Sequence, residues 1–486
     1  MLFNSYIFVL VFLPLSILGY FFLNKINKVT WAQCFLLGMS LWFYGYFNVK
    51  YLFIIVASIL FNYIMYRFLT RDIDNKIRKG ILIIAVLFNV GVLFVFKYYN
   101  FFMETVNSIF NTEFSLHQLV LPLGISFFTF QQLSFIVDSY TNDMPKYSFL
   151  SYALFVTFFP QLIAGPIVTH NELIPQFEDK ARQKLDWRHV SEGLYAFTLG
   201  LAKKVLIADT FGNAANWGFG NLAELDTISA VVCMLSYTIQ IYFDFSGYSD
   251  MALGIARMIN IDLPINFNSP YKALTITEFW DRWHITLTRF FTKYIYIPLG
   301  GNKRGNIRTY INMMIVFLIS GLWHGANWTF VIWGGMHGLF MVITRWKKKV
   351  FEKLHPVFNW MLTFIFVNFT WIIFRADSVK DALEYMQRIF ALQFNGLNEN
   401  ILQCFQLPEL VWLFDKLHFS IWYRFPYFFM VVFFLFSFIC ILGMKNTYER
   451  IINFKASFGK SLWTAILLIW CIFSFAGIST FLYFNF

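Results

Sequence analysis

Two histidines have the residue type and the surroundings for proton-transfer chemistry. His324 lies in the stretch SGLWHGANW (320–328), within an otherwise apolar segment, and its neighbour Gly325 leaves the imidazole room. Histidine titrates near neutral pH, so a histidine at membrane depth beside small residues is a candidate general base. It is equally consistent with a histidine that hydrogen-bonds a neighbouring helix, and residue type alone weighs the two interpretations evenly.

His284 closes the stretch EFWDRWH (278–284). Asp281 precedes it by three residues, so a helix would place both on one face and let the carboxylate orient the imidazole. Alternatively, the two tryptophans and the charges of this stretch form a belt at the level of the lipid headgroups. A third histidine, His337 in WGGMHG, is more often structural when it stands alone.

The segments that must position these residues are membrane helices. The chain has 486 residues, of which 58% are hydrophobic and 13% charged. Soluble domains are about 45–50% apolar and about 25% charged, which excludes a soluble protein. The five cysteines are scattered and show neither a disulfide framework nor metal-ligand spacing. The net charge of +11 indicates basic membrane loops rather than a nucleic-acid site, because no soluble basic domain is present.

Apolar blocks long enough to cross a bilayer recur along the chain, and about 10 to 12 of them are expected to cross. The first is interpreted as a retained anchor rather than a signal peptide, because no small-residue cleavage site follows it. The predicted spans are 5–23, 31–48, 51–69, 81–100, 118–137, 148–165, 190–208, 227–245, 307–326, 328–345, 357–375, 426–444 and 461–483.

Basic loops predict the orientation. Lysines and arginines gather at 25–28, 67–79, 345–353 and 445–460. Cytoplasmic loops carry the excess of Lys and Arg, so these loops are expected in the cytoplasm and the N-terminus outside.

The stretch 242–308 departs from a simple series of spanning helices. It combines several charged residues with Pro264, Pro270, Pro298 and the pair Gly300–Gly301. Charges and freed backbone groups at membrane depth need protein or water partners. We therefore expect re-entrant or short helices around an internal cavity. In the next segment Gly321 and Gly325 share a helix face, which favours close approach of a helix or ligand.

Ordered motifs along nearly the whole chain resemble the membrane-bound O-acyltransferase family, in its bacterial alginate and peptidoglycan O-acetylating branch. The motifs are LPLGISFFTFQQLSFIVDSY (121–140), FFPQLIAGPIVTHNELIPQF (158–177), YFDFSGYSDMALGIARM (242–258), FNSPYKALTITEFWDRWHITLTRFFTKYIYIPLGGNK (267–303), SGLWHGANWTFVIWGGMHG (320–338) and WIIFRADSVKDAL (371–383).

The resemblance implies an all-α polytopic membrane protein. It would form one domain over 1–486, with about 11 transmembrane helices and re-entrant segments around a central funnel or tunnel. The irregular catalytic region is expected at about 242–345. The family's catalytic histidine corresponds to His324, and its second histidine corresponds to His284.

Supporting roles are expected for Asp281, Arg282 and Asn327. Asp281 stands where many relatives have arginine. The pair Thr292–Lys293 replaces an expected Arg-Asp pair, which affects the cytoplasmic mouth or a partner contact rather than the histidines.

By the same resemblance, the donor is cytoplasmic acetyl-CoA and the acceptor is a hydroxyl of an extracytoplasmic polysaccharide, either alginate-like or peptidoglycan. No permanently bound cofactor and no metal are expected. The location implied is a bacterial cytoplasmic (inner) membrane, with a serine-type periplasmic or surface O-acetyltransferase as partner. Candidate ligands for the CoA phosphates are Lys293, Lys303, Arg304 and Arg308, although topology alone also explains their charge.

Two alternatives stay open. A D-alanyl transferase would take its acyl group from a carrier-protein thioester, although the blocks IPLGGNK and FFPQLIAGPI look closer to the acetyl-transferring branch. A polysaccharide or lipid transporter would use the histidines as a proton path. Transporters commonly show broken helices in two corresponding halves, whereas here the irregular stretch lies in one place, which favours an enzyme.

Overall fold

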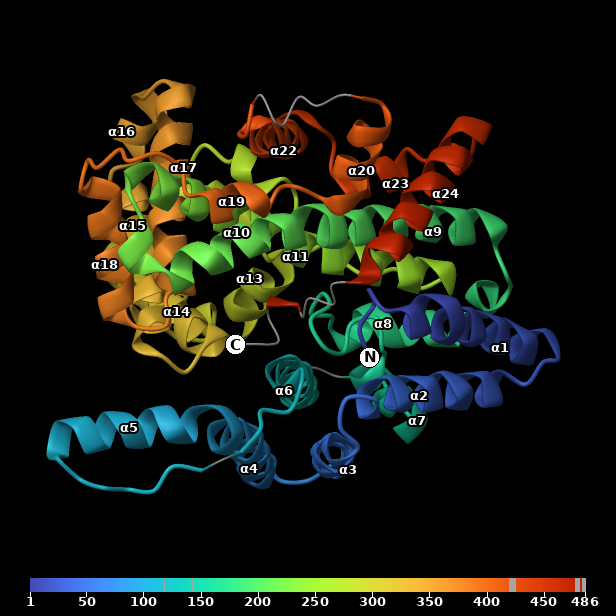
Figure 1. Ribbon diagram of the computed structural model, residues 1–486. Coiled ribbons are helices and arrows are strands. Elements are labelled where there is room, and N and C mark those ends of the chain that lie inside the picture. The colour runs from blue at the N-terminus through green and yellow to red at the C-terminus, as the bar shows by residue number, and fades with distance from the viewer. Residues whose placement is uncertain (118, 142–143, 419–424, 477–480, 483–486) are drawn as a thin grey trace.

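The computed structural model describes the chain except residues 118, 142–143, 419–424, 477–480 and 483–486. The described residues are helices and loops without a β-strand, and one isolated antiparallel bridge joins Phe267 to Trp283 (Figure 1). The prediction of an all-α protein is confirmed.

The described helices run from the first residues to the C-terminal region. In chain order the α-helices are α1 (Leu13–Lys25), α2 (Val29–Gly45), α3 (Lys50–Leu69), α4 (Asn75–Leu93), α5 (Tyr99–Phe110), α6 (Ile125–Thr141), α7 (Phe149–Thr157), α8 (His170–Glu178), α9 (Trp187–Ala202), α10 (Asp209–Gly220), α11 (Thr227–Met258), α12 (Ile276–Arg282), α13 (Ile285–Phe291), α14 (Gly305–His324), α15 (Trp328–Trp346), α16 (Lys348–Lys353), α17 (Pro356–Arg375), α18 (Val379–Phe390), α19 (Glu399–Gln403), α20 (Pro408–Lys416), α22 (Phe428–Phe438), α23 (Thr447–Ile452) and α24 (Phe458–Phe473). π-Helical turns occupy Phe8–Phe12, Phe94–Tyr98, Lys203–Ala208, Thr292–Tyr296 and Ile439–Gly443, and 3₁₀ turns occupy Lys180–Gln183, Leu222–Glu224, Pro270–Lys272 and Ser474–Ala476.

Several helices are long and apolar enough to cross a membrane. By length and hydropathy the described candidates are Phe8–Lys25, Lys50–Leu69, Asn75–Phe110, Thr227–Met258 and Pro356–Arg375. They coincide with five predicted spans. The protein is therefore a helical membrane protein, and the full number of crossings stays a prediction.

One predicted span is wrong. The block 148–165 forms only the nine-residue helix α7, which ends at Thr157. At 1.5 Å per residue it reaches about 14 Å, too short for the roughly 30 Å hydrocarbon layer. Its block is apolar because residues 151–168 are buried inside the protein, not because they face lipid.

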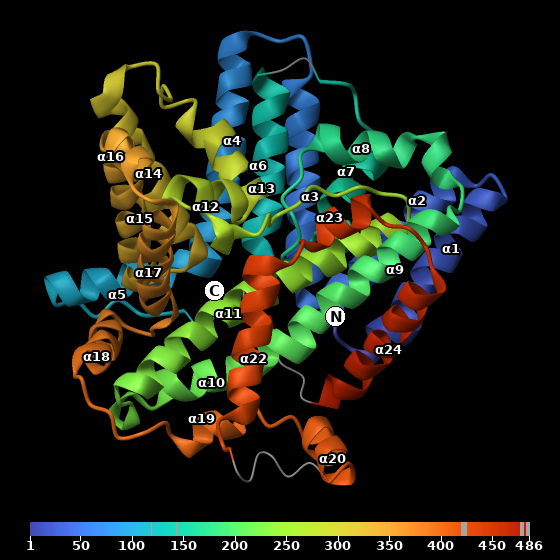
Figure 2. The ribbon, with the colours of Figure 1, turned by 90° about the horizontal axis from the view of Figure 1, so that it is seen from above.

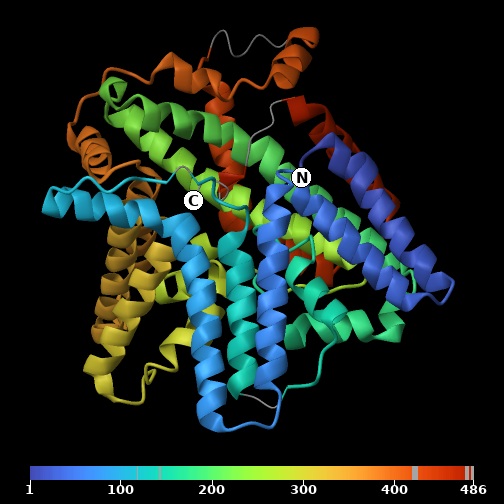
Figure 3. The ribbon, with the colours of Figure 1, turned by 90° about the horizontal axis from the view of Figure 1, so that it is seen from below.

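The helices form two groups around the long helix α11. In Figure 3, α3, α4 and α6 run side by side on one flank, and α5 turns away from α4 across the bundle. In Figure 2, α14, α15 and α17 stand together on another flank, while α9, α10 and α11 cross the centre. Helix α11 is buried along most of its 32 residues.

Helices α9 and α11 approach through paired glycines. A Cβ on Gly254 would lie 2.5 Å from the carbonyl oxygen of Gly193, and a Cβ on Gly200 would lie 2.5 Å from that of Gly247. Only glycine allows backbones to come this close, as in small-residue contacts of membrane helices. These contacts hold α11 against α9, and α11 carries buried polar side chains at the centre of the protein.

The irregular stretch begins later than the sequence predicts. The motif 242–258 continues α11 as one helix, and the broken region starts after Met258. Its charges are paired within the bundle, which lets the helix continue. Asp244 lies 2.7 Å from the ammonium of Lys204, and Asp250 pairs with Lys203.

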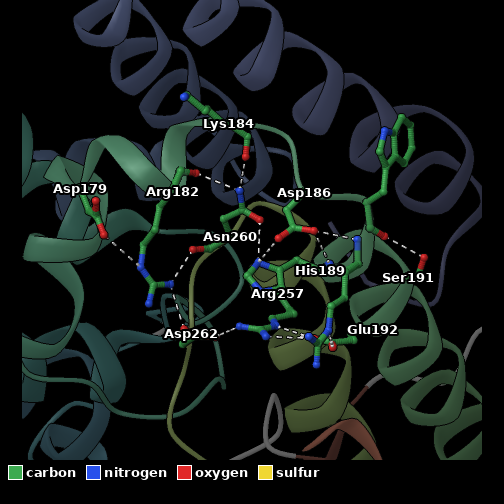
Figure 4. A network of polar contacts seen from close by, with 12 residues as sticks. Asp179, Arg182, Lys184, Asp186, His189, Ser191, Glu192, Arg257, Asn260 and Asp262 are labelled. Carbon is green, nitrogen blue, oxygen red and sulfur yellow. Dashed lines mark hydrogen bonds and ion pairs between the residues drawn. The ribbon is translucent and has the colours of Figure 1, made fainter. Parts of the chain in front are cut away.

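Basic loops gather at one end of the bundle, which we call the basic end. It carries loops 70–75, 300–305 and 346–356, at the upper edge of Figure 2. A polar network fastens the loop 179–188 there, as Figure 4 shows. The guanidinium of Arg257 bridges the buried carboxylate of Glu192 (2.9 Å) and Asp262, and Arg188 also pairs with Glu192 at 2.8 Å.

The network predicts a stability effect at Glu192. Glu192→Gln should lower the free energy of unfolding by about 3 kcal/mol, because it leaves two arginines without their buried counter-charge. Thermal unfolding of the purified protein in detergent measures the change. Glu352→Gln, at an exposed pair with Lys348, is the matched control and should change stability by less than about 0.5 kcal/mol. Equal stability of wild type and Glu192→Gln would contradict the assigned role.

Candidate active site

His324 lies at the last position of α14, at the end of this helix that points away from the basic end. Gly325 then leaves the helix in an extended conformation (φ −160°, ψ 150°). One turn earlier, Gly321 packs against Gly334 of α15, and a Cβ on Gly334 would come 3.2 Å from the Cα of Gly321. The predicted close helix approach at Gly321 is confirmed, and it holds the end of α14 in place. The predicted helix face shared with Gly325 is wrong, because Gly325 lies beyond the end of α14.

Aromatic rings surround His324, which is 3% exposed. Its ring centroid lies 4.9 Å from Trp323, 5.2 Å from Trp333 and 5.3 Å from Phe374. Trp323 also lies 6.0 Å from the ring of His284. One indole thus contacts both predicted catalytic histidines, so the structure brings the two histidines into one buried site.

His284 is completely buried between α12 and α13. It takes a left-handed backbone conformation (φ 46°), which is uncommon for a residue with a side chain. The predicted helix face shared with Asp281 is wrong, because α12 ends at Arg282 and the chain turns before His284. Asp281 lies on the exposed side of α12. The ring of His284 instead packs 4.8 Å from Phe245 of α11.

A lysine and a tyrosine hold the C-terminal end of α14. The ammonium of Lys97 donates to the carbonyl oxygens of Trp323 (2.6 Å) and His324 (3.2 Å), and the Tyr98 hydroxyl donates to that of Leu322 (2.9 Å). Helix ends leave such carbonyls unpaired, and a cation there is favourable. The π-helical turn Phe94–Tyr98 presents both donors, and such turns are frequent at functional sites.

A polar cavity of about 760 Å³ opens beside the end of α14. Lys97, Gly325 and Asn327 line it, together with Lys204 and Arg375. Asn327 caps α15 through its side-chain oxygen (3.1 Å to the N–H of Thr329) and donates to the carbonyl of Asp377 (2.9 Å). The predicted supporting residue Asn327 therefore shapes the cavity wall.

A narrow polar recess lies on the other side of the histidines, toward the basic end. It is lined by α11 and the loop before α12, including Ser246, Ser249 and Asn266. These three side chains are nine-tenths or more buried and carry polar atoms without a hydrogen-bond partner in the described part of the chain. Buried polar groups normally have partners, and the recess, about 10 Å³ in volume, has room for about one water molecule to supply them.

Other predicted residues have different surroundings. His337 is buried; Trp280 donates to its Nδ1 (3.2 Å), and its Nε2 lies 3.0 Å from the Thr370 hydroxyl. These contacts hold His337 as a link between helices, in agreement with the structural interpretation. Arg282 pairs with Glu278 at 2.8 Å and donates to the carbonyl oxygen of Asn268.

The four predicted phosphate ligands differ in their surroundings, with Arg308 half-buried on α14. Lys293 lies 2.9 Å from the buried carboxylate of Asp138, which also accepts from the Tyr294 hydroxyl. Lys303 and Arg304 are exposed at the basic end, and the described residues give them no ion pair. Within the described residues, no group of three His, Cys, Asp or Glu side chains is arranged to hold a metal ion.

Sequence reasoning missed the lysines of the cavity. Lys97 and Lys204 stand within apolar helical stretches, and Lys204 is 5% exposed between Asp209 and Asp244. An ionisable residue in an apolar span was a usable signal, since such residues face the bundle interior and mark functional sites. Which groups they contact was not readable from the sequence.

Comparison with known proteins identifies the family. The model of the MBOAT family, the membrane-bound O-acyltransferases, matches residues 34–378. The chain belongs to this family. The matched region includes α14 and both histidines, so these parts of the site lie within the family domain. The protein is an acyltransferase of the membrane.

Named relatives cover most or all of the chain. A peptidoglycan O-acetyltransferase of Helicobacter pylori is 40% identical over the whole chain and 98% of its own length. A probable alginate O-acetylase of Pseudomonas aeruginosa is 37% identical over 85% of this chain and 79% of its own. A teichoic acid D-alanyltransferase of Bacillus subtilis is 27% identical over 53% of this chain and 69% of its own.

The contact of α14 with α15 predicts an effect on activity. Gly334→Ala should cost about 1–3 kcal/mol of stability and lower turnover about tenfold, because the added Cβ displaces the helix end that carries His324. Gly335→Ala is the matched control, since its Cβ would meet only Leu318 at 3.7 Å. Turnover and thermal unfolding are measured for both. Full turnover in Gly334→Ala would contradict the positioning role of this contact.

Proposed function

We propose that this protein transfers acetyl groups from cytoplasmic acetyl-CoA toward hydroxyls of an extracytoplasmic polysaccharide. The chain is a membrane O-acetyltransferase, in keeping with its family and relatives. The observation that carries the proposal is the placement of the histidine pair. His284 and His324 lie between the polar recess toward the basic end and the large cavity at the opposite end.

The basic loops support the sidedness. Because Lys- and Arg-rich loops stay in the cytoplasm, the basic end faces the cytoplasm and the cavity beside Asn327 faces outward. The predicted funnel or tunnel then consists of the recess, the histidine site and the cavity in series. The location proposed is the cytoplasmic membrane of a bacterium.

The recess has a volume of only about 10 Å³, room for about one water molecule, so it does not hold the arm of an acyl-CoA donor and instead offers hydrogen-bonding groups to a water or donor atom that reaches it. Ser246, Ser249 and Asn266 offer such groups, buried and unpaired in the described part of the chain. At the mouth, Lys303 and Arg304 are proposed to contact the phosphates of the donor. Lys293 is a weaker candidate, because Asp138 already pairs with its ammonium.

The chemistry follows from the site. The acceptor oxygen attacks the thioester carbonyl, its proton passes to His324, and the C–S bond breaks to release CoA. Negative charge develops on the carbonyl oxygen. The buried indole N–H groups of Trp323 and Trp333 have no acceptor among the described atoms, and both rings contact His324. We assign them to the developing oxyanion. His284 supports the site from the donor side.

The acceptor side is assigned by analogy with the relatives. Their names include peptidoglycan and alginate as modified polymers. The cavity of about 760 Å³ has room for a sugar hydroxyl or for the serine of a partner transferase. A serine-type periplasmic or surface partner is therefore part of the proposal.

A donor comparison tests the proposal. The purified protein in nanodiscs receives acetyl-CoA or a D-alanyl carrier-protein thioester, and release of free thiol is measured. We expect thiol release from acetyl-CoA only. Release from the carrier thioester alone would assign the protein to D-alanyl transfer, as in the Bacillus subtilis relative. Absence of release from both, with a proton flux in liposomes that hold the same protein, would favour the transporter.

A further inference from the structure

An apolar groove of about 500 Å³ runs along the side of the bundle, away from the histidines. Its walls come from α9, α22 and α24, with Leu206, Val432 and Trp463 among the lining residues. We call it the side groove. In Figure 2, α22 rises from the lower part of the molecule to its middle, with α9 and α24 to its right. The groove therefore runs along an apolar flank of the bundle.

The walls of the side groove are open to their surroundings. Val432 is 44% exposed, Phe436 48% and Trp463 57%. In a membrane protein these side chains face hydrocarbon, where an acyl chain is the available apolar occupant. The walls α22 and α24 lie beyond residue 378, where the family match ends. Much of the groove's wall thus lies outside the part of the chain that the family model matches.

Two cations stand at the end of the side groove that lies just after α22. Lys445 and Arg450 both line it. The Nε of Arg450 donates to the carbonyl oxygen of Lys445 (3.0 Å), which draws the two charges together. Among the described residues neither forms an ion pair, whereas the third cation of the groove, Lys203, is paired with Asp250. The groove therefore ends in positive charge without a protein counter-charge.

An apolar slot that ends in uncompensated positive charge, in a loop expected on the cytoplasmic side, matches one class of molecule. We propose that the side groove binds an anionic glycerophospholipid, with an acyl chain along α22 and α24 and the headgroup phosphate on Lys445 and Arg450. A zwitterionic lipid offers the same chain but no net negative charge. Each cation near the membrane surface contributes a factor of about five, so both together give a preference of about 25-fold.

The site also touches the donor recess. Tyr242, Asn446 and Thr447 line both the side groove and the recess. A bound lipid thus packs against the segment that closes the recess toward the basic end. We expect the bound lipid to raise the unfolding temperature of the protein.

Native mass spectrometry of the whole purified protein tests the site. The protein is equilibrated with equal amounts of phosphatidylglycerol and phosphatidylcholine, and the retained lipids are counted. Wild type should retain phosphatidylglycerol about 25-fold over phosphatidylcholine, and the double variant Lys445→Gln/Arg450→Gln should retain both equally. The control Lys349→Gln/Lys353→Gln, which removes two exposed cations of α16 and its end, should keep the preference.

A second variant tests the chain-binding part. Val432→Trp fills the groove from an exposed position and should lose the retained lipid while the protein unfolds at an unchanged temperature in lipid-free detergent. Equal retention of both lipids by wild type would overturn the proposal, as would full retention by Val432→Trp. Displacement of the lipid by coenzyme A would also overturn it, because the two cations would then belong to the donor site.

Discussion

His324→Gln should lower acetyl transfer by about 10³-fold, the loss of a general base. Glutamine has a similar length and keeps a polar group among Trp323, Trp333 and Phe374, but it cannot accept the proton of the attacking hydroxyl. Turnover of acetyl-CoA and the O-acetyl content of the polysaccharide measure the effect. His324→Ala should lose as much activity.

A matched histidine separates this effect from loss of packing. His337 is equally buried and contacts the same ring of Trp333 at 4.8 Å. His337→Gln should reduce thermal stability, since it disturbs the contacts with Trp280 and Thr370, yet keep turnover within a few fold. If His324→Gln inserts normally and retains wild-type turnover, His324 is not the base.

Lys97→Met should lower turnover by about 10²-fold with little change in the apparent affinity for the donor. Methionine keeps the length of the side chain but leaves the carbonyl oxygens of Trp323 and His324 without their donor. The end of α14 then shifts, and a displacement of about 1 Å at a reacting group costs about 10²-fold. Steady-state kinetics with separate kcat and KM values measure the change.

The conservative variant distinguishes positioning from simple stability. Lys97→Arg restores a cation and several N–H donors, and its turnover should be at least about tenfold higher than that of Lys97→Met. Tyr98→Phe removes one hydrogen bond, to Leu322, and should have a smaller effect than Lys97→Met. A Lys97→Met variant that loses thermal stability but keeps kcat would contradict the positioning role.

The sequence predicted which residues gather at the site better than which residues hold them there. His324, Gly321 and the all-helical membrane fold were readable, because apolar runs and intramembrane histidines reflect local requirements. The pairing of His324 with His284 through Trp323 depended on the family motifs. The motifs identify the residues, but whether these residues touch one another depends on how the chain folds.

The errors have a common physical cause. Residues 148–165 look like a span because buried protein interior and lipid demand the same apolar side chains. Asp281 was placed beside His284 by helical spacing, but the helix ends between them. The irregular stretch was expected to begin at residue 242, but α11 continues to Met258, and Lys204 from another segment neutralises Asp244 within it. Long-range partners decide such cases, and one sequence does not show them.

Transfer of labelled acetyl groups across the membrane of inverted vesicles tests the central claim most directly. Such vesicles expose the cytoplasmic face, so acetyl-CoA labelled in its acetyl group reaches the basic end from outside. Wild type should release free CoA outside and accumulate labelled O-acetyl groups inside the vesicles, and His324→Gln should do neither. Equal accumulation by His324→Gln would contradict the account, as would label appearing only on the outer side.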